Sequence, residues 1–218
     1  MDEKKQKGVT VCFPIITFII ILASLLSSIF PELESAFIFD RSALIRGEFW
    51  RIFTCHFVHF SNTHLTYNLI TFGIAGYVFE KKNYSYFFLL LLCLAFSISI
   101  SLLTLKPNMR YYGGLSGVVC GVLYYCALMG IKETRPWQTI CFLTVLFLPI
   151  KIAVEIYNSA SVLPYFGNQS FIPMQTSHIA GCLAAVSFYF SAQKRDKDLA
   201  SQLKQTANDP VPGGSSLH

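Results

Sequence analysis

The segment YSYFFLLLLCLAFSISISLLTL, residues 84–105, contains no charged side chain in 22 residues. A transmembrane helix needs about 20 consecutive and mostly apolar residues. A backbone inside lipid must also satisfy its own hydrogen bonds, which a helix does. The segment is therefore predicted to cross a membrane as a helix.

The rest of the chain repeats this pattern. Of its 218 residues, 53% are hydrophobic and 13% are charged, and ordinary soluble domains carry about twice that charged share. Five further apolar runs raise the predicted number of spans to six: Val11–Phe30, His64–Glu80, Leu115–Ile131, Gln138–Tyr157 and His178–Gln193. The first run is too long for a signal peptide and is interpreted as an anchor. We predict an all-α membrane protein, a six-transmembrane helical bundle formed by residues 1–197, followed by a polar, disordered tail at residues 198–218.

The basic residues predict the orientation of this bundle. The net charge is +5, and Lys and Arg lie beside apolar runs, which is typical of topology signals rather than of a nucleic-acid surface. With the N-terminus in the cytoplasm, ten Lys and Arg residues lie inside and five outside. We therefore expect both termini in the cytoplasm (N-in/C-in). The seven cysteines show no CxxC pattern, and most are interpreted as small buried hydrophobes.

Polar residues in a membrane span are expensive and are candidates for function. In the stretch HFVHFSNTHLTYNLITFGIAGYVFE, residues 56–80, His64 and Asn68 are four residues apart and share one helix face. His59 lies near the start of that helix. The alternative is a polar cluster solvated at the interface, and this is our interpretation of His56.

A second candidate is GGLSGVVCGV, residues 113–122. Gly117 and Gly121 form a GxxxG face, which permits close helix contact. Ser116 is expected in the first turn, where free backbone N–H groups suit a developing oxyanion. Packing alone is the competing interpretation of this short motif.

A third candidate is QTSHIAGCLAA, residues 175–185. His178 and Gly181 share a face that suits close contact with another small-residue helix. Ser116 and His178 both begin spans that enter from the outer side, so they are expected at the same depth. A lone helix histidine is more often a satisfied core residue. Lys151 and Glu155, four residues apart, are expected to pair within one helix in a structural role.

These residue types suggest nucleophilic catalysis. A serine hydroxyl needs a base to remove its proton, and a neutral histidine can do so near pH 7. No carboxylate lies near His178 in the sequence, so a two-residue Ser/His arrangement is predicted. The oxyanion donors would be the N–H of Ser116 and the side chains of His64 and Asn68. The segment 158–177, with Pro164, Gly167 and Pro173, is expected to act as a movable cover.

In order and spacing, these motifs resemble the rhomboid intramembrane serine proteases over the whole six-span core. The matching features are His59-x4-His64-x3-Asn68, Trp50-Arg51, Glu80, Gly114-Leu115-Ser116-Gly117 and Ser177-His178-x-x-Gly181. The resemblance implies a Ser116–His178 dyad with His64 and Asn68 at the oxyanion. It implies a fourth span that starts late, from a water-filled cavity open to the outer side. It also implies a structural or water-binding His59.

Cys120 stands where many rhomboids have an aromatic residue stacked on the histidine, so something else must hold His178. Lys151 and Glu155, with the short length, look more like the rhombosortase branch. That branch is thought to process exported proteins with a C-terminal Gly-Gly, membrane-span and basic-tail signal.

The sequence thus favours a serine endopeptidase that cleaves single-span membrane proteins near their outer end. Its expected location is a bacterial inner membrane, with the active site facing the periplasm or exterior. Its expected partners are these substrates and membrane lipid, with no cofactor, metal or nucleic acid. One alternative is a catalytically silent relative that binds spans. Another is a transporter or metal site using His59, His64, His178, Lys151 and Glu155, but no inverted repeat or HExxH pattern supports it.

Overall fold

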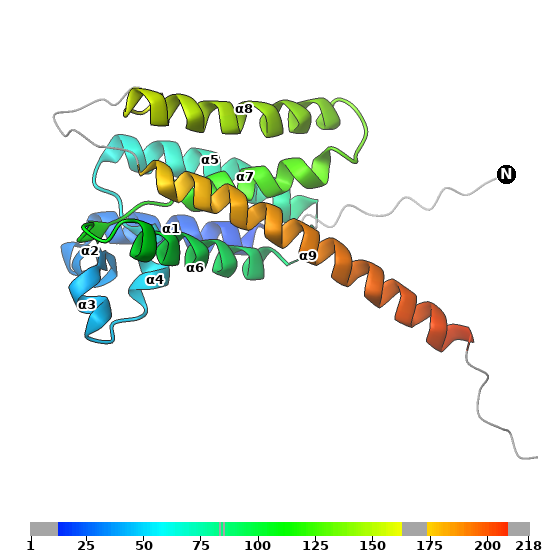
Figure 1. Cartoon of the computed structure of the whole chain (residues 1–218), viewed down its shortest axis with the longest axis horizontal. Helices are drawn as coiled ribbons and strands as arrows, with labels where there is room; N and C mark the ends of the chain where they lie inside the picture. The colour runs from blue at the N-terminus through cyan, green and yellow to red at the C-terminus, as the bar shows by residue number, and fades with distance from the viewer. Residues whose placement is uncertain (1–12, 83, 85, 163–173, 209–218) are drawn as a thin grey trace, which may run out of the picture.

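The computed structural model of the chain describes residues 13–82, 84, 86–162 and 174–208, and most of them are helical (Figure 1). The elements of this described part are α1 (Ile15–Ile29), α2 (Pro31–Phe37), β1 (Phe39–Asp40), α3 (Arg41–Ile45), α4 (Arg51–Thr54), the 3-10 turn η1 (Cys55–Phe57), α5 (Asn62–Lys81), α6 (Phe87–Leu105), β2 (Tyr111–Tyr112), α7 (Ser116–Gly130), α8 (Trp137–Asn158) and α9 (Gln175–Asn208). The segment predicted to act as a cover, with Pro164, Gly167 and Pro173, lies outside the described residues.

Six helices occupy the ranges predicted to span a membrane: α1, α5, α6, α7, α8 and α9. By length and composition, α6 and α8 can each cross a membrane, and α1 with α2 is a third candidate if this pair, bent by 113°, counts as one span. α7 is apolar but has only 15 residues. The fold is that of an integral membrane protein with two or three clear spans among the described residues, while the count of six and the N-in/C-in orientation stay predictions.

The segment between the first two predicted spans is not a plain loop, because it folds into α2, β1, α3, α4 and η1. The Asp40 carboxylate accepts hydrogen bonds from the N–H groups of Ser42 (2.8 Å) and Ala43 (3.3 Å), which caps α3. β1 pairs antiparallel with β2, with Phe39 opposite Tyr112. This pairing attaches the segment to the chain just before α7.

Trp50 and Arg51 hold the same segment together. The Arg51 guanidinium donates to the carbonyls of Ser35 (2.9 Å) and Ile38 (2.7 Å) and pairs with the Glu48 carboxylate at 2.7 Å. The Trp50 indole N–H donates to the carbonyl of Ala36 at 3.1 Å. Both side chains therefore organise the surface beside the helices.

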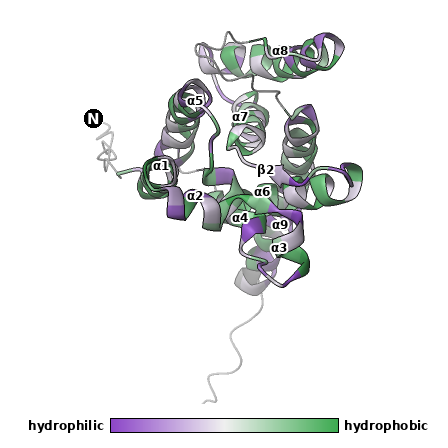
Figure 2. Cartoon of the chain, turned by 90° about the vertical axis from the view of Figure 1, so that its left-hand side faces the viewer, coloured by the Kyte–Doolittle hydropathy of each residue, from purple (hydrophilic) through white to green (hydrophobic). Residues whose placement is uncertain are grey.

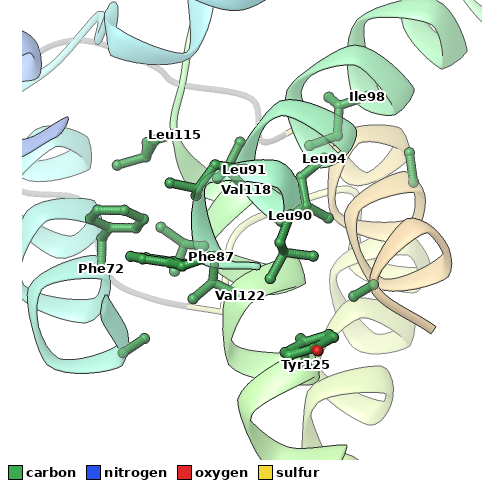
Figure 3. Close-up of a cluster of buried hydrophobic side chains, with 14 of the residues drawn as sticks. Phe72, Phe87, Leu90, Leu91, Leu94, Ile98, Leu115, Val118, Val122 and Tyr125 are labelled. Atoms are coloured by element: carbon green, nitrogen blue, oxygen red, sulfur yellow. The ribbon is translucent and has the colours of Figure 1, made fainter. Parts of the chain in front are cut away.

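α7 is the central helix and contacts α5, α6, α8 and α9. Figure 2 looks along the bundle and shows α7 between α5, α6 and α8. The apolar core forms where α7 faces α5 and α6, as Figure 3 shows for Phe72, Phe87, Leu90 and Tyr125. The rings of Phe79 and Phe87 stack there with centroids 4.3 Å apart.

A row of glycines joins α7 to α9. A Cβ on Gly181 would lie 2.1 Å from the carbonyl oxygen of Gly117, and a Cβ on Gly117 would lie 2.8 Å from that of Ser177. A Cβ on Gly121 would meet Leu94 at 2.5 Å and the Gly181 carbonyl at 2.9 Å. These separations leave no room for a side chain, so the two backbones touch along what we call the glycine seam. The contact predicted from small residues is therefore present.

Glu80, at the end of α5, ties that helix to the start of α1. Its carboxylate accepts hydrogen bonds from the N–H (2.8 Å) and hydroxyl (2.7 Å) of Thr17. These bonds satisfy donors in the first turn of α1. Gly76, one turn earlier in α5, also lies against Thr17. Together these contacts fix how α1 sits on α5.

The end of α9 differs from the prediction of a disordered tail. The helix continues to Asn208, so residues 198–208 extend it beyond the bundle (Figure 1). The sequence DLASQLKQTAN contains no Gly or Pro, and it follows a helix that is already nucleated. Residues 209–218 lie outside the described part of the chain.

Candidate functional site

A cavity of about 160 Å³ lies where α5, α7, α8 and α9 meet. Its polar lining consists chiefly of His64, Asn68, Ser116, Lys151, Glu155 and His178. Such a volume holds several water molecules. The residues predicted to carry the chemistry therefore line one hollow inside the bundle. We call this end of the bundle the site end and the opposite one the far end.

Ser116 is the first residue of α7 and is half-buried. The N–H groups of a first helical turn have no partner within the helix. Gly114, two residues earlier, has φ +149, and a Cβ there would lie 2.8 Å from Cε1 of His64 and 3.8 Å from Oγ of Ser116. Glycine at 114 is thus required for the backbone to lie against His64, and it places that ring near the serine.

The loop before Ser116 is held from several sides. The N–H of Gly114 donates to the carbonyl of Cys55 at 3.1 Å, and the Gly114 carbonyl accepts from the Tyr112 hydroxyl at 3.1 Å. His56 lies in the same place, buried, with its ring nitrogens 3.4 Å from the Gly114 carbonyl and 3.1 Å from the Ala95 carbonyl. His56 is therefore a packed core residue and not the solvated interface residue that the sequence suggested.

The glycine seam places the start of α7 directly against the start of α9. Gly117 follows Ser116 and faces the carbonyl of Ser177, which precedes His178. Ser116 and His178 accordingly line the same cavity. Their equal depth in a membrane stays a prediction.

His178 is 4% exposed and contacts a carboxylate that sequence reasoning did not assign to it. Its Nδ1 lies 3.2 Å from Oε2 of Glu155, and the other oxygen, Oε1, lies 2.8 Å from Nζ of Lys151. The Lys151–Glu155 pair expected from the four-residue spacing is present, but its carboxylate also reaches the histidine. The two-residue Ser/His arrangement was predicted because no carboxylate lies near His178 in the sequence, whereas Glu155 reaches the ring from 23 residues away.

A signal for this contact was present in the sequence. Glu155 lies three residues before the end of α8, and His178 lies three residues after the start of α9. Consecutive antiparallel helices place such positions at the same height. A carboxylate inside an apolar run also needs a charged or hydrogen-bonding partner.

Asn68 and His59 form a second polar pair. The Nδ1 of His59 lies 3.1 Å from the carbonyl of Phe57, which can only accept, so this nitrogen carries the proton. The Nε2 of His59 is then the acceptor for Nδ2 of Asn68, at 3.1 Å. This bond fixes the Asn68 amide with one N–H used and the other left for a further acceptor. His59 therefore orients Asn68, a role that the spacing did not reveal.

Cys120 also lines the cavity, one turn after Ser116. It is buried and supplies no aromatic surface for His178. The described residues include no group of three or more His, Cys, Asp or Glu side chains arranged to hold a metal ion. Together the cavity residues comprise a hydroxyl at a helix start, a buried imidazole with a carboxylate, and an oriented amide.

A comparison with protein families identifies the chain's relatives. The family model described as Rhomboid domain matches residues 46–194, which is more than half of the chain. The matched segment includes every residue that lines the cavity.

Proposed function

The chain belongs to the rhomboid family, and on that premise we propose that it is an intramembrane serine protease that cleaves single-span membrane proteins. Members of this family are generally intramembrane serine proteases that act on transmembrane substrates. The observation that carries the proposal is the cavity lined by Ser116, His178, His64 and Asn68, which come from three different helices.

In the proposed reaction, Oγ of Ser116 attacks the carbonyl carbon of the substrate peptide bond, and His178 takes the hydroxyl proton. The tetrahedral oxyanion accepts hydrogen bonds from the N–H of Ser116 and from Asn68 and His64. His178 then gives its proton to the leaving amine, which departs as the C–N bond breaks. A cavity water, activated by His178, hydrolyses the acyl-enzyme and frees Ser116.

The cavity size supports the need for water at this depth. Hydrolysis of an acyl-enzyme requires a water molecule beside the serine, and the hollow has room for several. We further propose that the site end faces the outer side of a bacterial inner membrane, so that cleavage occurs near the outer end of the substrate span. The charge bias of the loops supports this orientation.

Covalent labelling tests the proposal. A fluorophosphonate probe, which phosphorylates an activated serine, is expected to label the wild-type chain in detergent and not the Ser116→Ala variant. Ser161→Ala is the matched control, because Ser161 lines the same cavity without standing at a helix start. Ser161→Ala is expected to label normally. Equal labelling of wild type and Ser116→Ala would overturn the assignment of the nucleophile, and no labelling of either would favour the catalytically silent relative.

The substrate class is a finer proposal. By its resemblance to rhombosortases, we propose that the substrate is an exported protein held by a C-terminal Gly-Gly, span and basic-tail anchor. Co-expression with a single-span reporter carrying this signal is expected to release the reporter. A reporter whose Gly-Gly is replaced by Val-Val should stay anchored, whereas equal release of both reporters would remove the rhombosortase assignment and leave the protease assignment intact.

A further inference from the structure

We infer that Glu155 is a positioning residue that fixes His178 in the form able to accept the Ser116 proton, and that Lys151 holds Glu155 in place. The site would then consist of three residues in contact, Ser116, His178 and Glu155, instead of a dyad. This inference rests on the proposed protease function and adds a residue to it.

The first step is the contact itself. Oε2 of Glu155 lies 3.2 Å from Nδ1 of His178, and the two side chains are 1% and 5% exposed. A second link comes from the start of α9, where the side-chain amide of Gln175 donates to the backbone carbonyl of Glu155 at 3.3 Å. Glu155 is thus tied to α9 twice, by its carboxylate to His178 and by its backbone carbonyl to Gln175.

The second step follows from hydrogen-bond chemistry. An ionised carboxylate has only acceptors, so Nδ1 of His178 must carry the proton in this contact. In a neutral imidazole the other nitrogen, Nε2, then keeps its lone pair and can act as a base. When Nε2 takes a proton, the imidazolium formed is stabilised by the adjacent negative charge.

The third step concerns the charge of Glu155. A buried carboxylate is unfavourable unless it is paired, and Nζ of Lys151 lies 2.8 Å from Oε1. Lys151 is 30% exposed and so keeps contact with water while it neutralises the carboxylate. The other titratable groups that line the cavity around this pair are His64 and Tyr67 from α5 and Cys120 from α7. None of them is a carboxylate, so Glu155 is the acid in the cavity lining that can orient the histidine.

The contact also accounts for the missing aromatic residue. Cys120, on the α7 face that lines the cavity, is too small to stack on His178. A hydrogen bond from Nδ1 to Glu155 fixes the ring by direction instead of by stacking. The sequence left open what holds His178, and Glu155 answers that question.

Steady-state cleavage of a single-span substrate by the full chain in detergent micelles tests the inference. Glu155→Gln is expected to lower kcat by about 10²–10⁴-fold, because an amide can donate to Nδ1 and leave the wrong nitrogen protonated. KM should change by less than about threefold, since Glu155 does not touch substrate. The acidic limb of the pH–rate profile should move to lower pH, because the imidazolium loses its carboxylate.

The controls separate positioning from structural support. Lys151→Met keeps the side-chain length without the charge and should lower kcat less than Glu155→Gln does. If Glu155→Gln fails to fold, Glu155→Asp is used instead to separate a positioning role from a structural one. Positioning predicts a lower kcat with an acidic limb close to wild type, whereas a structural role predicts a wild-type kcat with a lower Tm.

Two different outcomes overturn two different claims. If Glu155→Gln keeps kcat within about twofold of wild type and the same pH–rate profile, while Ser116→Ala is inactive, the role of Glu155 is refuted and the protease assignment stands. If Ser116→Ala cleaves as well as wild type, the proposed function fails whatever Glu155 does.

Discussion

A Lys–Glu pair lies beside each end of α7, and the two pairs have different surroundings. At the site end, Glu155 pairs with Lys151 and contacts the ring of His178. At the far end, just beyond Gly130, Glu133 pairs with Lys82 and accepts from the hydroxyl of Tyr84. The first carboxylate is 1% exposed, and the second is 32% exposed.

Burial decides what each pair can do. Water screens the far-end pair, and exposed ion pairs are worth about 0–1 kcal/mol. The site-end pair is removed from water, where an unpaired partner would be strongly unfavourable and a paired one has a fixed direction. A carboxylate that only joined two helices would serve as well at the surface. Its location in the cavity therefore points to the histidine as the reason for its burial.

Among the variants that test the site end, Asn68→Ala should have the largest effect on activity. We expect kcat to fall by about 10²–10³-fold, because an oriented amide donor to the oxyanion is lost. Asn62→Ala, which changes an exposed asparagine at the start of the same helix, should leave kcat unchanged. Cleavage assays on both variants make the comparison, and equal activity of Asn68→Ala and wild type would remove Asn68 from the site.

A substitution in the glycine seam should give the next largest loss of activity. A Cβ on Gly181 would lie 2.1 Å from the Gly117 carbonyl oxygen, so Gly181→Ala must push α7 and α9 apart by about 1 Å, a misplacement that can lower activity about 10²-fold. Gly73→Ala is the matched control, since its Cβ would meet Ile21 at an ordinary 3.5 Å. The relevant measurement is substrate cleavage, with Tm as the record of folding. Full activity of Gly181→Ala would show that the seam does not set the site geometry.

His59 should give a smaller effect, because it acts through Asn68. His59→Phe removes the acceptor for Nδ2 of Asn68, and we expect a fall in kcat of about tenfold, the equivalent of one hydrogen bond. His59→Gln, which offers a replacement acceptor, should recover part of this loss. In the double variant with Asn68→Ala, His59→Phe should add little. Additive losses would mean that His59 acts independently of Asn68.

The far-end pair should give the smallest effect. Partial burial raises the pKa of Glu133, but the hydrogen bonds from Lys82 and Tyr84 outweigh it and bring the pKa below its usual range. A lowered pKa in the folded chain adds stability that is present above the unfolded value and is lost as pH falls through the folded value. Glu133→Gln should therefore lower the free energy of unfolding by under about 1 kcal/mol at neutral pH, seen as a slightly lower Tm, and the difference should shrink in acid.

The activity of Glu133→Gln completes this comparison. We expect its kcat to equal that of wild type, because the carboxylate is at the opposite end of α7 from Ser116. A loss as large as that of Glu155→Gln would show that the two ends are not separate in function.

The sequence predicted the helices better than their connections. The apolar runs placed α6 and α8 within three residues of their observed bounds, because twenty apolar residues leave a backbone in lipid few alternatives. The segment between α1 and α5 was less predictable, since its short helices depend on local caps such as Asp40 and on contacts of Arg51 with distant carbonyls. The extension of α9 was missed because polar composition was taken for disorder.

The site was predictable where spacing along one helix carries the information. His64 and Asn68, or Lys151 and Glu155, lie on one face by simple periodicity. The contact of Glu155 with His178 crosses from one helix to another over 23 residues and appears only when helix ends are aligned in space. The bond from His59 to Asn68 depends on a bend in the chain before α5, which no periodicity encodes.

α8 is attached to the bundle by few side chains. Three of its 22 residues are buried, Cys141, Ile152 and Glu155, and most of its surface is apolar and exposed. The helix that carries the orienting carboxylate is thus weakly anchored, while Ser116 and His178 are held together by backbone contact. An outward shift of α8 would move Glu155 away from His178 and leave the ring without its orienting carboxylate, while Ser116 stays in place. Spin labels on α8 and α9 would record such an off state as a longer separation that accompanies lower turnover.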